Sequence, residues 1–102
     1  MDIDIDAGVR RALAEVREGA LSVELTLHFC GGLVTKDAVA YPGAEDEAAG
    51  FQRERVGDLD LYWRQRLVVE GSTASRVSTE IVPRHLRVRT KDGMLSAQAS
   101  YE

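Results

Sequence analysis

The stretch that decides the fold is Leu59–Val69, LDLYWRQRLVV. Its apolar residues fall on alternate positions over eleven residues, and only Gln65 interrupts the apolar set. This period of two is typical of a strand with one buried face and one solvated face. Trp63, the only tryptophan of the chain, belongs to the apolar set, where its large side chain can anchor a core. We therefore predict that Leu59–Val69 is the central strand of an antiparallel sheet.

Size and composition indicate a single globular domain over residues 1–102. The apolar fraction is 44% and the charged fraction 29%, which is ordinary for such a domain. Cys30 is the only cysteine, so no internal disulfide can form, and a reducing, cytoplasmic location is expected. No apolar run approaches the roughly 18 residues of a membrane span, and the acidic N-terminus is unlike a secretory signal.

Charge is distributed unevenly along the chain. The formal net charge is -4, but residues 1–50 hold 4 basic and 10 acidic side chains, whereas residues 51–102 hold 9 basic and 7 acidic ones. The overall acidity argues against general nucleic-acid binding. The basic excess of the second half permits a local surface that binds anions.

A helix is predicted over Ala7–Glu18. Asp6 is suited to cap its beginning, and Gly19 is suited to end it. Four apolar residues follow the helical spacing and form a single stripe: Val9, Ala12, Leu13 and Val16. A helix of about 12 residues is marginal alone, so this stripe must pack on the sheet.

Alternating patterns predict the other strands. Leu21–Phe29 is followed by Gly31-Gly32, which suits a two-residue hairpin turn, and Leu33–Tyr41 returns as a weaker strand at an edge. Further strands are expected over Arg76–Val82, His85–Thr90 and Met94–Tyr101, with turns at Gly71-Ser72-Thr73 and Lys91-Asp92-Gly93. Met1–Ile5 alternates too, as an edge strand or a disordered tail.

Residues 42–57 are predicted to form the longest loop, with a turn or two of helix around Glu45–Arg55 as the alternative, which Gly50 weakens. They begin with Pro42-Gly43, are acidic and rich in small residues, and then become mostly charged. Phe51 is the one bulky side chain that can attach this loop to the body. The resulting fold class is α+β, with one N-terminal helix packed on a curled antiparallel sheet of about five to six strands. The alternative is a small closed β-barrel in which the helix plugs one end.

Catalytic chemistry has few candidates. His28 and Cys30 share the polar face of one predicted strand, about 7 Å apart at the usual strand rise. With Tyr62 they are weak candidates for a small cysteine- or histidine-dependent enzyme with a pocket between helix and sheet. No recognised ligand spacing or phosphate-binding loop occurs, so neither a metal nor a cofactor is expected.

The stretch His28-Phe29-Cys30-Gly31-Gly32, followed by Leu33–Val39, resembles an early strand pair of trypsin-like serine proteases over about a tenth of the chain. In that family an Ala-Ala-His-Cys stretch follows, whereas Ala40–Ala44 here contains no histidine. The Gly-Asp-Ser-Gly-Gly stretch of the family is also missing. The resemblance therefore transfers no catalytic residue to this chain.

Four arginines are the candidate binding residues. Arg64 and Arg66 share the polar face of one strand, and Arg87 and Arg89 share that of another, both faces pointing away from the helix. If these strands are neighbours, the four guanidinium groups can bind carboxylates or phosphates. The alternative is that the arginines pair across strands with acidic residues of this chain: Glu24, Asp58, Asp60 and Glu80.

These observations favour a non-catalytic module that binds a protein or ligand and associates with itself. A protein partner or a second copy is the expected occupant of the arginine face, without membrane or nucleic-acid binding. The small enzyme built on His28, Cys30 and Tyr62 is the alternative.

Overall fold

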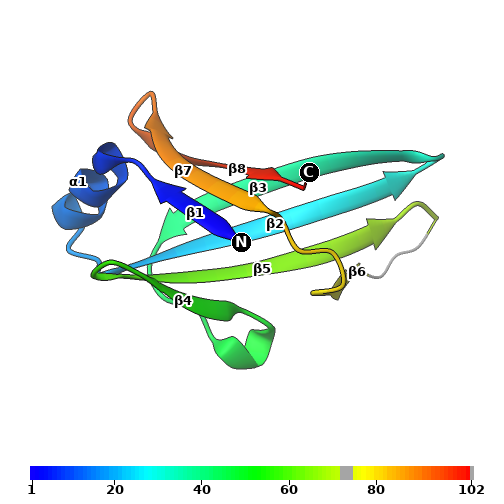
Figure 1. The fold of residues 1–102 in the computed structure, drawn as a ribbon, viewed down its shortest axis with the longest axis horizontal. Coiled ribbons are helices and arrows are strands. Elements are labelled where there is room, and N and C mark those ends of the chain that lie inside the picture. The colour runs from blue at the N-terminus through cyan, green and yellow to red at the C-terminus, as the bar shows by residue number, and fades with distance from the viewer. Residues whose placement is uncertain (72–74, 102) are drawn as a thin grey trace.

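The computed structural model describes residues 1–71 and 75–101. In this part of the chain one helix and two β-sheets form a small α+β fold (Figure 1). The elements are, in chain order, β1 (Asp2–Ile5), α1 (Ala7–Glu15), β2 (Ala20–Cys30), β3 (Leu33–Pro42), a short 3-10 helix η1 (Glu47–Ala49), β4 (Gln52–Val56), β5 (Leu59–Val69), β6 (Ser75–Val77), β7 (His85–Lys91) and β8 (Met94–Ser100). The predicted α+β class and the N-terminal helix are confirmed.

The strands form a five-stranded sheet and a three-stranded sheet instead of one curled sheet. The large sheet has the order β3-β2-β5-β4, with β6 also paired to β5, and the small sheet has the order β1-β7-β8. Two pairs are parallel, β2 with β5 and β1 with β7, so the prediction of a purely antiparallel sheet is wrong. The prediction of β5 as a central strand is confirmed.

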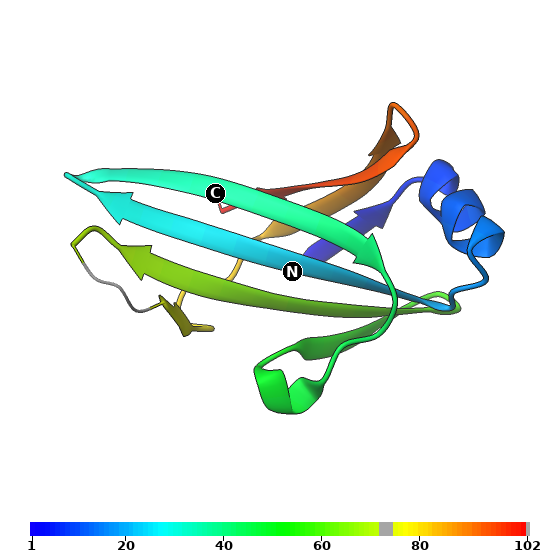
Figure 2. The same cartoon turned by 180° about the vertical axis from the view of Figure 1, so that it is seen from behind.

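The parallel pair of β2 and β5 follows from the connection between β3 and β4. Strand β3 is one edge of the large sheet and β4 lies near the other, so residues 43–51 cross the sheet from edge to edge (Figure 2). The chain then enters β4 and reverses into β5, which consequently runs in the same direction as β2. Within the loop predicted over residues 42–57, the alternative of a helical turn is realised as η1, but the prediction overlooks β4, whose charged sequence lacks the apolar alternation of a half-buried strand.

The core lies between the inner faces of the two sheets, with α1 packed at one end. Leu61 is 0% exposed and Trp63 5% exposed, which confirms the inward face of β5. The indole N–H of Trp63 donates to Glu54 Oε1 at 3.4 Å. The buried core cluster consists of Val9, Leu13, Leu21, Val23, Leu25, Leu59, Leu61, Trp63, Leu86 and Val88.

The closed barrel is not formed. Strands β3 and β8 approach with Cα atoms within 8 Å, but they belong to different sheets. Across the described ranges, no backbone hydrogen bond joins these two strands. The domain is therefore two packed sheets with an open seam between β3 and β8.

The helix is shorter than predicted, and Gly19 does not end it. Arg17 adopts a φ of 56°, and the Glu18 N–H reaches back to the Leu13 carbonyl at 2.9 Å. This left-handed residue ends the helix in the way a glycine usually does. The Asp6 side chain does not cap the helix.

Gln65 explains the interruption in the apolar pattern of β5. Its side chain is 1% exposed and points into the core, where its Oε1 accepts a hydrogen bond from the Tyr101 hydroxyl at 2.5 Å and its amide nitrogen donates to the Ile81 carbonyl. The segment after β6 is thereby held against β5. The predicted strand Arg76–Val82 is accordingly only Ser75–Val77, because the chain leaves the ladder to reach this contact.

The short turns are as predicted where they are described. Gly31 and Gly32 both have positive φ, as do Asp92 and Gly93, which suits two-residue hairpins. The predicted turn at Gly71-Ser72-Thr73 falls largely on residues 72–74, which lie outside the described residues.

The N-terminal strand is an edge strand of the small sheet. No helix in the described part of the chain is long and apolar enough to cross a membrane.

Candidate interaction surfaces

The four candidate arginines lie on two separate surfaces. Arg64 and Arg66 belong to β5 in the large sheet, and Arg87 and Arg89 belong to β7 in the small sheet. Inner residues of both strands meet in the core, so these arginines project from the two opposite outer faces. Because β5 and β7 are not neighbours in one sheet, the predicted cluster of four guanidinium groups is not formed.

Arg64 has a structural role. Its Nη2 lies 2.5 Å from Glu24 Oε1, directly across the β2–β5 pair, and its Nη1 donates to the Ala49 carbonyl at 2.9 Å. The guanidinium also lies over the Phe51 ring, 4.4 Å from its centroid. With a side chain that is only 16% exposed, Arg64 fastens the crossover of residues 43–51 to the sheet and offers little to a partner.

Of the other three arginines, Arg87 is exposed, whereas Arg66 and Arg89 are half-buried. Arg66 donates to Ser75 Oγ at 3.1 Å, and Arg87, two residues before Arg89 on β7, lies 3.7 Å from the Asp6 carboxylate. The alternative in which arginines pair with acidic residues of the chain is therefore confirmed for Arg64 and Glu24.

The remaining three acidic residues of that alternative pair with other arginines. Asp58 pairs with Arg10 at 2.6 Å, and Glu80 pairs with Arg76 at 3.1 Å. The partners of Asp60 come from a strand that the sequence pattern missed.

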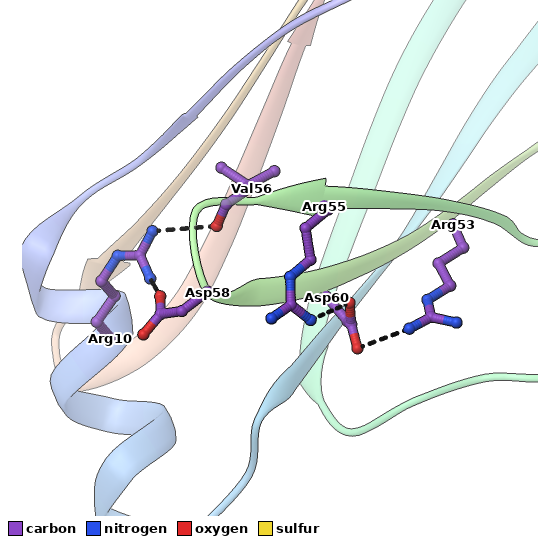
Figure 3. A network of polar contacts seen from close by, with 6 residues as sticks. All are labelled: Arg10, Arg53, Arg55, Val56, Asp58 and Asp60. Carbon is purple, nitrogen blue, oxygen red and sulfur yellow. Dashed lines mark hydrogen bonds and ion pairs between the residues drawn. The ribbon is translucent and has the colours of Figure 1, made fainter.

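A polar network stabilises the β4–β5 hairpin (Figure 3). Asp60 accepts from Arg55 at 2.8 Å and from Arg53 at 3.1 Å, both on the neighbouring β4. The hydrogen bond from Arg55, followed by that from Arg53, lowers the pKa of Asp60, and the Asp60 carboxylate raises the pKa of Arg53. Arg10 of α1 also donates to the Val56 carbonyl at 3.3 Å, so the helix is tied to this hairpin. Arg53 and Arg55 alternate along β4, and this alternation is the sequence feature from which the polar face of β4 could have been predicted.

The beginning of the crossover is fixed by two further hydrogen bonds. The Ser22 hydroxyl, 0% exposed, donates to the Gly43 carbonyl at 2.7 Å. The Tyr41 hydroxyl donates to Glu45 at 3.0 Å. Burial of the phenol and this bond to a carboxylate raise the pKa of Tyr41 to about 12. Residues 43–51 are thus attached to β2, β3 and β5 on the outer face.

The weak catalytic candidates are not assembled into one site. His28 and Cys30 are exposed on the outer face of β2, as the alternation predicted. Tyr62 lies opposite Ser22, six residues along the sheet from His28, or about 20 Å at the usual strand rise. The small cleft between α1 and the β4–β5 hairpin, of about 220 Å³, is lined by none of the three. Three or more metal-type ligands do not gather anywhere in the described residues.

An apolar surface lies at the end of the large sheet that is far from α1. At the far end of the large sheet, Phe29 lies across from Val34 of β3 and Val69 of β5 on the inner face. Val34 is 47% exposed and Val69 53% exposed, and they line a cleft of about 430 Å³ whose lining also includes Leu33, Cys30 and Glu70. The alternating apolar residues of these strands predicted an apolar face here. The same alternation, taken alone, implied that this face is buried.

We call these four residues, Phe29, Leu33, Val34 and Val69, the apolar end. In both ribbon views the tips of β2, β3 and β5 reach beyond the small sheet at this end (Figures 1 and 2).

The chain matches no model in a scan of protein families, no protein in a search of curated proteins and no structure in a search of solved structures.

Proposed function

We propose that this domain is a non-catalytic protein-interaction module that associates with a second copy through the apolar end. The observation that carries the proposal is the inner face of the large sheet, which continues past the small sheet as the row Val34–Phe29–Val69. Contiguous exposed apolar side chains on a folded domain are typical of interaction sites.

A second copy is the occupant that the surface fits best. The cleft at the apolar end is lined mainly by uncharged side chains, with Glu70 as its one charged lining residue, so a comparably apolar patch is the surface that fits it. A two-fold axis through the apolar end supplies the same patch from the other copy, as in most homodimers. The arginine surfaces have a smaller part in this proposal, since Arg64 is engaged within the domain.

The test compares two substitutions on one strand. Val34→Lys places a charge on the inner face at the apolar end, whereas Val39→Lys places the same charge on the outer face of β3, at a residue that is 53% exposed. We expect Val34→Lys to shift the protein from dimer to monomer in sedimentation velocity and Val39→Lys to leave the dimer unchanged. A wild-type protein that stays monomeric at high concentration, or equal effects of the two substitutions, would refute the proposal.

A further inference from the structure

The open seam between β3 and β8 presents two strand edges to each other. The strands lie side by side with Cα atoms within 8 Å, without a backbone ladder between them in the described ranges. A groove of about 320 Å³ follows the seam and is lined by residues of both strands, including Asp37, Ala38, Ala97 and Ala99. The seam is separate from the apolar end.

The hairpin geometry shows which backbone groups of β3 face the seam. The Gly31-Gly32 turn is closed by the pair Cys30 and Leu33, and in a two-residue hairpin the closing pair exchanges its hydrogen bonds. Odd-numbered residues of β3 therefore bond to β2, which agrees with the Gly43 N–H donating to the Ala20 carbonyl at 2.9 Å. The N–H and C=O groups of even-numbered residues, including Ala38, point toward the seam.

The β7–β8 hairpin shows in the same way which backbone groups of β8 face the seam. The Asp92-Gly93 turn is closed by Lys91 and Met94, so even-numbered residues of β8 bond to β7. The backbone groups of Ala97 and Ala99 then point outward, toward β3. Both edges thus offer N–H and C=O groups that no ladder of the described residues uses.

One of these edge groups is already occupied by a side chain. The Ala38 N–H donates to Asp37 Oδ1 at 3.0 Å. The Asp37 carboxylate therefore supplies the acceptor that the carbonyl of a neighbouring strand would otherwise supply. A charged residue at an exposed edge is also a common protection against unwanted strand pairing.

We propose that the seam accepts an extended segment of a partner protein as an added strand. A carbonyl of the segment replaces Asp37 at the Ala38 N–H, and the released carboxylate then favours a basic residue on the outer face of the segment. Inward positions of the segment must be small and apolar, because they meet Ala97 and Ala99 and the core beyond them. This site is independent of self-association through the apolar end.

Binding requires a modest opening of the seam. A strand between two others needs about 9.5 Å from edge to edge, which is more than the present separation. Opening separates the Lys36 ammonium from the Tyr101 ring, whose centre lies 5.3 Å away, and strains the hydrogen bond from the Tyr101 hydroxyl to Gln65 of β5. It also uncovers Ala38, Ala97 and Ala99, which pack against the core, so the apolar inward side chains of the segment must replace these contacts.

The first probe is the peptide acetyl-Ser-Val-Lys-Ala-Lys-Val-Ser-amide, titrated into isotope-labelled protein. We expect amide resonances of Ala38, Ala97 and Ala99 to shift, and a version N-methylated at alternate backbone amides to bind at least about tenfold more weakly. A version with Glu in place of both Lys should also bind more weakly. The absence of shifts at these amides, or equal binding of the N-methylated peptide, would overturn the proposal.

The second test alters the edge itself. Ala38→Pro removes the N–H that faces the seam but no donor of the β2–β3 ladder, so the fold is expected to persist and peptide binding to fall by about tenfold. Ala38→Ser keeps the N–H and serves as the matched control. Should Ala38→Pro fold and bind as tightly as Ala38→Ser, the added strand is refuted. Because the peptide comparison uses wild-type protein, it decides the question even where Ala38→Pro unfolds.

Discussion

The two halves of the large sheet differ although the same strands build them. In the half near α1, the small sheet covers the inner face, and residues 43–51 cross the outer face. In the far half, β2 and β5 continue with the same alternation, but Phe29 is only half-buried and Val69 is 53% exposed. Alternation therefore marks the faces of a strand, and the reach of other elements determines whether a face is covered.

The two halves also differ in the ion pairing of their outer-face arginines. Arg64 there pairs with Glu24, whereas Arg66, two residues further along, contacts only the Ser75 hydroxyl among the contacts of the described residues. Gln65 lies between the two halves and holds the segment after β6 across the boundary. Four predictions test this contrast, ordered from the largest expected effect to the smallest.

The largest difference is expected between two truncations on β5. Leu61→Ala in the covered half removes a fully buried side chain and should lower the free energy of unfolding by about 2–5 kcal/mol. Val69→Ala at the apolar end should cost less than about 1 kcal/mol, because that side chain is already half in water. Urea denaturation of both variants measures the difference, at a protein concentration that keeps both monomeric. Similar losses in the two variants would contradict the division into halves.

Substitutions of Gln65 and Tyr101 test the hydrogen bonds at the boundary between the two halves of the large sheet. Gln65→Leu leaves the Ile81 carbonyl and the Tyr101 hydroxyl without their partner, and a cost of about 1–3 kcal/mol is expected. Tyr101→Phe removes only one of the two hydrogen bonds and should cost less. In a double-mutant cycle the two substitutions should be non-additive. Strict additivity would show that the buried hydrogen bond between them contributes nothing.

The outer face is tested with the two neighbouring arginines. Arg64→Ala removes the ion pair with Glu24 and the contacts to the crossover, with an expected cost of about 1–3 kcal/mol. Arg66→Ala should cost less than about 1 kcal/mol, because Arg66 is half-buried but donates only to the Ser75 hydroxyl among the described residues. Thermal unfolding of the matched pair measures both. Equal effects would mean that Arg64 does not fasten the crossover.

Tyr41 provides a spectroscopic probe of the covered half. Its pKa is raised from 10.0 to about 12, so the protonated phenol is favoured by folding. Its contribution to stability is fully present below pH 10 and is lost as the pH rises from 10 through about 12. Burial also raises the pKa of Tyr101, so the titration is best followed in a Tyr101→Phe background, where the tyrosinate absorbance should contain a late component that disappears when Tyr41→Phe is added. Persistence of the late component in the double variant would show that it does not come from Tyr41.

Several strand faces and turns could be predicted from the amino-acid sequence. The alternation in Leu59–Val69 correctly predicted the inward Trp63, Gly31-Gly32 correctly predicted a hairpin, and Lys91-Asp92-Gly93 correctly predicted a turn. These features are local, since side chains alternate along any strand and few residues tolerate positive φ. The helix could be predicted because the helical spacing of its apolar residues is also a local feature. Its end could not, since the left-handed residue Arg17 ends the helix and Gly19 does not.

The pairing of the strands and the surfaces that remain free could not be predicted from the sequence, because they depend on contacts between distant residues. The parallel pairing of β2 with β5 depends on a crossover whose anchors, Arg64 and Ser22, lie far from it in the sequence. The separation of the four candidate arginines onto opposite faces depends on that pairing too. A period of two assigns each side chain to one of two faces, but it contains no information about which strand is adjacent or how far the covering sheet extends.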